Sequence, residues 1–165
     1  MKKFLTLGLV LITTNLFAVT GFYQTIDDKT NMPRSIVKIF EYDDGKIGGR
    51  IVAMYDTKGN IEDTIVTPTR RSTRLSGNPH LSGLDILWEL RHDGKEYSGG
   101  RIMDPQSGSA YRARIWQENP AHLSVRGQLG IGIGRTQTWN TLDTAALPAE
   151  LRNLDTSAWT PTPRN

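Results

Sequence analysis

The chain contains no cysteine, and this absence excludes several kinds of chemistry at once. There is no disulfide framework, no thiol nucleophile and no cysteine-ligated metal, so a packed core has to stabilise the folded state. The only histidines are His80, His92 and His122. Each lies among turn-forming residues, and no two have ligand spacing on one element, so we expect no metal site and no cofactor.

Catalytic motifs are also missing. No Gly-x-Ser-x-Gly elbow occurs in the chain, and Ser107 sits in a turn-like context. The adjacent carboxylates Asp27-Asp28 and Asp43-Asp44 lie at the ends of expected strands. Solvated turn caps are far commoner there than acid-base catalysts. We therefore expect no catalytic residues and a protein that is not an enzyme.

No hydrophobic run is long enough to cross a bilayer, which takes about 20 apolar residues. The one apolar stretch, residues 4–12, follows Met1-Lys2-Lys3 and precedes Leu16-Phe17-Ala18. This charged, apolar and small-residue order is typical of a secretory signal peptide. We expect residues 1–18 to be a signal peptide cleaved near Ala18, which predicts a secreted or periplasmic protein without stable membrane insertion.

A strong excess of charge is absent too. The formal net charge of +3 would fall to +1 (+3 − 2) once Lys2 and Lys3 were removed with the signal peptide. The basic cluster Arg70, Arg71 and Arg74 has no aromatic residues interleaved with it. Because nucleic-acid binding needs a basic surface or aromatic stacking platforms, we expect no nucleic-acid partner.

What the chain does contain is alternation with a period of two, centred on residues 99–139. Short turn sequences rich in aspartate, proline and glycine separate the alternating segments, as in antiparallel hairpins. In two neighbouring strands apolar residues share one face. The apolar set is Tyr111, Ala113, Ile115, Leu123, Val125, Gly127 and Leu129, and the alternate set includes Arg112, Arg114, Trp116 and Arg126.

Further strands are expected at residues 21–26, 36–42, 47–55, 84–91 and 96–103. Many short strands joined by hairpin turns, with almost no helix, fit either a sandwich or an up-and-down barrel. Sequential hairpins favour the barrel, which has no exposed edge strands. The predicted fold is all-β: an antiparallel up-and-down barrel of about eight or nine strands with a short C-terminal helical tail.

Three segments depart from this pattern. Residues 56–79 form a long polar connection, which is expected to contain either a short strand at Ile65-Val66 or a helical turn. The glycine-rich residues 130–134 precede a strand-like sequence rather than a helix, so they indicate a flexible corner and not a phosphate loop. In the tail, residues 142–165, leucines at 147, 151 and 154 predict a short helix followed by a frayed end.

Several ordered motifs resemble the secreted bacterial family called domain of unknown function 2147. They are Thr20-Gly21-Phe22-Tyr23, residues 83–88, the segment 99–105 with Gly108 and Tyr111, and residues 125–130 leading to 137–139. The resemblance implies a lipocalin-like (calycin-type) barrel over residues 19–141, and it makes a small lipophilic or amphipathic ligand plausible. The family has no established activity.

Candidate ligand-binding residues follow from the alternation. Trp88, Tyr111, Ile115, Leu123 and Val125 are expected to face the barrel interior, where they either pack the core or line a cavity. Arg126 falls on the opposite face. A register shift that turned it inward would allow it to bind a carboxylate or phosphate head group.

Two functions remain open from the sequence. The first is an exported, non-enzymatic protein that binds or carries a small hydrophobic or amphipathic ligand in its barrel. The alternative is a solidly packed barrel that acts as a protein-interaction module at the cell envelope or host interface, with an unidentified partner. The volume and lining of the interior distinguish them.

Overall fold

The computed structural model describes residues 18–162, so the expected signal peptide lies outside the described residues except for Ala18. Within residues 18–162, nine strands and two short helical segments follow one another. They are β1 (Gly21–Ile26), β2 (Pro33–Glu41), β3 (Ile47–Tyr55), β4 (Ile61–Thr64), β5 (Asp85–His92), β6 (Tyr97–Met103), β7 (Ala110–Asn119), β8 (His122–Gln128), β9 (Gly134–Leu142), η1 (Thr144–Ala146) and α1 (Ala149–Arg152).

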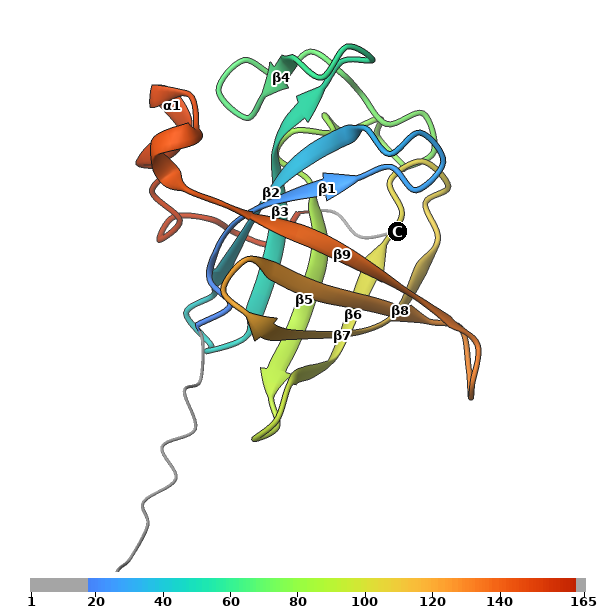
Figure 1. Ribbon diagram of the computed structural model, residues 1–165. Helices are drawn as coiled ribbons and strands as arrows, with labels where there is room; N and C mark the ends of the chain where they lie inside the picture. Colours follow the sequence, from blue (N-terminus) through green and yellow to red (C-terminus); the bar gives the residue numbers. More distant parts are fainter. Residues whose placement is uncertain (1–17, 163–165) are drawn as a thin grey trace, which may run out of the picture.

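The strands form one antiparallel sheet that closes on itself (Figure 1). Its order is β2-β1-β9-β8-β7-β6-β5-β3-β4, and β2 also pairs with β3. All strands except β4 therefore belong to a closed ring. β4 is outside the ring and pairs only with the C-terminal end of β3. The predicted all-β antiparallel barrel is confirmed, including its up-and-down order of hairpins.

The long connection between β3 and β5 differs from the expectation in one respect. The short strand proposed at Ile65-Val66 is wrong, because the structure places β4 at Ile61–Thr64 instead. The cause is local: the Asp56 carboxylate accepts the backbone N–H groups of Lys58 and Asn60, at 2.8 Å each. This tight turn returns the chain at once to pair with β3.

One end of the barrel is filled by large side chains. Tyr23, Leu90, Leu123 and Trp139 are almost completely buried there, together with Ile39, Ile47 and Ile115. The Tyr23 hydroxyl donates to the carbonyl oxygen of Val19 at 2.9 Å. Burial raises the pKa of Tyr23 to about 12, so this phenol remains a hydrogen-bond donor throughout the physiological range. We call this end the sealed end.

A second apolar cluster lies outside the barrel, where the C-terminal tail covers the outer face of β1, β2 and β3. Leu147 and Leu151 pack there against Phe22, Ile36 and Val52. The tail was expected to fray at residues 161–163, but Thr162 is held, because its backbone N–H donates to Asp85 at 3.1 Å. Residue 163 lies outside the described residues. In the described part of the chain, no helix has the length and apolar character needed to span a membrane.

Candidate functional site: a cavity at the open end of the barrel

The end of the barrel opposite the sealed end contains a cavity of about 570 Å³. Its walls come mainly from the C-terminal halves of β1, β3, β6 and β8 and the N-terminal halves of β2, β5, β7 and β9, and Trp139, which also packs the sealed end, forms part of the wall. Its rim is built by the β1–β2, β6–β7 and β8–β9 turns. The barrel is therefore packed in one half and hollow in the other.

The inner wall is mainly apolar, with a few polar groups that bond to one another. Ile51, Met54, Ile86, Val125 and Trp139 supply the apolar surface. The hydroxyls of Thr25 and Ser35 share a hydrogen bond of 2.7 Å. The Trp139 indole N–H donates to Gln137 at 3.4 Å. Such a wall suits the apolar part of a small molecule.

The β1–β2 turn lies across the mouth of the cavity and is held to β9. Asp28 forms an ion pair with Arg135 and accepts a hydrogen bond of 2.8 Å from the Gln137 side-chain amide. Asp27 shapes the same turn by accepting the backbone N–H groups of Thr30 and Lys29, which lower its pKa. This part of the rim is therefore polar, and its Asp27 carboxylate is ionised at neutral pH.

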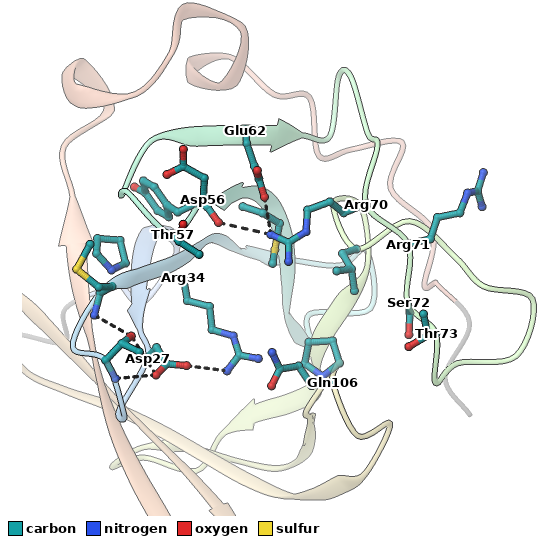
Figure 2. A pocket seen from close by; sticks show the side chains of 17 residues that line it. Asp27, Arg34, Asp56, Thr57, Glu62, Arg70, Arg71, Ser72, Thr73 and Gln106 are labelled. Carbon is teal, nitrogen blue, oxygen red and sulfur yellow. Dashed lines mark hydrogen bonds and ion pairs between the residues drawn. The ribbon is translucent and has the colours of Figure 1, made fainter.

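A second cavity of about 540 Å³ adjoins the first, and Figure 2 shows its lining. We call it the antechamber. It lies between the β1–β2 turn and the β3–β5 connection. Arg70, in the antechamber wall, pairs with Glu62 at 2.8 Å. The residues common to both cavities are Asp27, Arg34, Met54, Pro105 and Gln106.

Arg34 is the cation at this junction. Its guanidinium group points into the antechamber near Gln106 (Figure 2) and lies 3.8 Å from the Asp27 carboxylate, which is beyond hydrogen-bonding distance. Its side chain is about one-third exposed (31%). A guanidinium carries five N–H donors, so Arg34 retains donors for an anionic group that enters from either cavity.

Asp63 holds the antechamber wall in place through buried hydrogen bonds. Its carboxylate is buried and accepts the Ser82 hydroxyl at 2.6 Å, the Thr69 hydroxyl at 2.9 Å and the backbone N–H of Arg70 at 3.2 Å. Burial alone would raise the pKa of Asp63, but these hydrogen bonds outweigh it and lower the pKa. One ionised carboxylate thus holds both ends of the 69–82 segment.

The structure brings two of the expected ligand-binding residues to the cavity. Tyr111 and Val125 line it. Ile115 and Leu123 are completely buried towards the sealed end, where they pack the core. Arg126 is on the outer face of β8, and its guanidinium donates to the Thr136 hydroxyl at 3.0 Å. The β8–β9 register runs without a shift, so no bulge turns Arg126 inward.

Trp88 is buried but does not line the cavity. It pairs with Arg101, whereas its neighbour Leu87 pairs with Ile102, which in turn pairs with Tyr111. The register places Trp88 on the arginine-bearing face of the sheet. The cause is a pair of register shifts between β3 and β5. At each shift β5 has one residue more than β3, which interrupts the alternation of inward and outward side chains along β5.

The polar residues of the site were not predicted from the sequence. Arg34 and Gln106 had no distinguishing motif, and Thr25, Ser35 and Gln137 occupy inward positions that the pattern assigns to apolar side chains. The sequence did contain a signal for Gln137: it lies two residues before Trp139 in β9, so both side chains are on the same face of the strand. No group of three or more potential metal-ligating side chains occurs within residues 18–162.

Comparisons with known proteins agree with this geometry. A model of the family described as "Uncharacterized protein conserved in bacteria (DUF2147)" matches residues 21–141. Among solved structures, the chain is similar to protein HP1028 from Helicobacter pylori, described as belonging to the lipocalin family. The two share 23% identity with a TM-score of 0.61, over 76% of this chain and 84% of that one. This likeness shows a lipocalin-like fold. No curated protein matches the chain.

Proposed function

We propose that this chain, which belongs to the DUF2147 family and has a lipocalin-like barrel, is an exported, non-enzymatic protein. Its ligand would be a small amphipathic molecule. The observation that carries this proposal is the cavity at the open end, whose apolar wall ends at Arg34. Ligand pockets typically enclose about 300–1,000 Å³, and this cavity lies in that range.

The two cavities suggest how such a ligand would lie. An apolar chain would occupy the barrel between Met54, Val125 and Trp139. Its polar head would then reach the junction with the antechamber, where Arg34 can donate to a carboxylate or phosphate. The nearby Asp27 would remain the counter-ion of Arg34 in the empty protein. This arrangement favours an anionic amphiphile over an uncharged one.

The hollow half of the barrel also disfavours the alternative of a solidly packed interaction module. Export is supported by the order of charged, apolar and small residues at positions 1–18. The intact mass of protein recovered from the periplasm would show whether these residues are removed.

Titration calorimetry with laurate and with dodecanol, both below their aggregation concentrations, tests the proposal. We expect wild type to bind laurate more tightly, because a hydrogen bond to a charged group contributes about 1.5–3 kcal/mol. Arg34→Gln should weaken laurate binding by about tenfold or more and leave dodecanol binding unchanged. Arg126→Gln is the matched control, since it removes an arginine outside the cavity. If neither compound binds wild type, or if both variants behave alike, the site assignment is wrong.

A further inference from the structure

The β8–β9 turn exposes an unusual amount of apolar surface. Leu129, Ile131 and Ile133 are 67%, 105% and 64% exposed. Among residues 18–162, the other exposed large hydrophobic side chains are Met32 and Val66. We call residues 129–133 the hairpin tip. Figure 1 shows it projecting from the barrel, beyond the labelled end of β8.

The hairpin tip is a formed turn that packs little against the rest of the described chain. The backbone N–H of Leu129 donates to the carbonyl oxygen of Ile133 at 3.0 Å and closes it. Gly130 and Gly132 alternate with the apolar residues, and both have positive φ values, of 119° and 80°. Apart from the adjacent residues in the chain, no described residue has an atom within 4 Å of where a Cβ would stand at either glycine. Ile131 therefore projects fully into solvent from a narrow backbone, and about two-thirds of the surface of Leu129 and Ile133 is exposed beside it.

The strands behind the hairpin tip carry more cations than acids. Residues 122–142 contain no aspartate or glutamate. On the outer face, Arg114 lies directly opposite Arg126, and Arg101 lies directly opposite Arg112. Like charges in such cross-strand positions are destabilising unless an anion neutralises them. Within the described chain, Glu96 pairs with Arg114 at 3.0 Å. We call this surface of β6, β7 and β8 the arginine face.

We propose that the hairpin tip and the arginine face together dock this protein on an anionic lipid surface. A protein partner is disfavoured because the core of a protein interface is apolar and depleted of charge, whereas here the apolar part is three side chains on a narrow turn and the rest is cationic. A bilayer surface accepts a narrow apolar loop and attracts the arginines behind it.

Docking of this kind would also orient the cavity. Leu129 and Ile133 line the mouth of the barrel as well as forming the hairpin tip. A tip inserted among lipid head groups would place that mouth at the lipid surface. The proposal goes beyond ligand binding and does not depend on it, since docking requires only the exposed side chains.

Co-sedimentation with two kinds of vesicle tests the proposal: phosphatidylcholine alone, and phosphatidylcholine mixed with phosphatidylglycerol. We expect wild type to bind only the anionic vesicles and to lose that binding at high salt. Ile131→Ser should weaken the affinity about tenfold, because it removes a large share of the inserted apolar surface. Val66→Ser is the matched control, because Val66 is 53% exposed but lies in the β3–β5 connection. It should bind as wild type does.

A second variant tests the electrostatic part. Arg112→Gln combined with Arg126→Gln should lower the affinity for anionic vesicles by at least about tenfold, since each surface arginine contributes about fivefold. Circular dichroism melts check that each variant folds. Wild type that fails to bind anionic vesicles would overturn the proposal, as would an Ile131→Ser protein that binds them fully. Sedimentation showing self-association lost in Ile131→Ser, without vesicle binding, would assign the hairpin tip to a second copy instead.

Discussion

At the scale of single residues, the Arg50–Asp85 pair shows how one contact can join distant parts of the chain. Arg50 Nε donates to Asp85 Oδ1 at 2.7 Å, and the two side chains are 8% and 0% exposed. The Arg50 guanidinium also stacks over Trp159 and donates to the carbonyl oxygen of Thr160 at 2.6 Å. Asp85 in turn accepts the Tyr42 hydroxyl at 2.5 Å. Arg50 thereby joins β3, β5 and the C-terminal tail.

We predict that Arg50→Ala lowers the free energy of unfolding by about 3–5 kcal/mol, because it leaves the buried Asp85 carboxylate without its cationic partner. Urea denaturation followed by circular dichroism measures this change. Lys46→Ala is the control, since the Lys46–Asp44 pair lies in an exposed turn, and it should leave the midpoint unchanged. Equal midpoints for Arg50→Ala and wild type would mean that the pair contributes nothing to stability.

At the scale of elements, the β3–β5 connection is more ordered than its polar sequence indicates. Residues 69–82 have no apolar alternation, and an isolated bridge between Arg71 and His80 is their only sheet-like pairing in the described structure. The connection is instead organised by the buried carboxylate of Asp63, which bonds to Thr69, Arg70 and Ser82. A single acidic side chain thereby positions one wall of the antechamber.

This dependence predicts a pH effect. The pKa of Asp63 is lowered in the folded protein relative to about 3.9 in the unfolded chain. Its contribution to stability is therefore fully present above the unfolded pKa and is lost as the pH falls through the folded pKa. We expect Asp63→Asn to be destabilised at pH 7 and to lose less stability than wild type on acidification. Urea midpoints at pH 7 and at an acidic pH below the unfolded pKa measure this change. Asp43→Asn, which removes a carboxylate from an exposed turn, is the control. Parallel pH profiles for Asp63→Asn and wild type would contradict the prediction.

At the scale of the whole molecule, the barrel depends on a segment outside the family match. The matched residues end at 141, yet Leu147 and Leu151 are needed to cover the apolar outer face around Ile36 and Val52. A barrel without the tail would expose this cluster to water.

We predict that truncation after Leu142 lowers the melting temperature strongly and causes self-association. Leu151→Ala alone should cost about 2–5 kcal/mol, as expected for a fully buried leucine. Thermal melts and size-exclusion chromatography provide the measurements, and the exposed variant Asn153→Ala should behave as wild type. A truncated chain that remains monomeric and melts with the full-length protein would show that the tail is dispensable.

The sequence by itself determined the elements and their order. Alternating residues and turn motifs located β1 and β3 with their observed bounds, and the succession of hairpins indicated an antiparallel barrel. These features are local, because a turn is specified by a few neighbouring residues and the pleat alternates with a period of two. The apolar faces of β7 and β8 could be predicted for the same reason.

Only the tertiary structure decided where along the barrel each inward residue lies. Val125 reaches the cavity, whereas Leu123 on the same face packs the sealed end. Trp88 changes face because β5 carries extra residues relative to β3. Arg34 becomes a site residue because a turn and a distant connection close around it. Register and bulges arise from pairing between segments far apart in the chain, and local alternation contains no information about them.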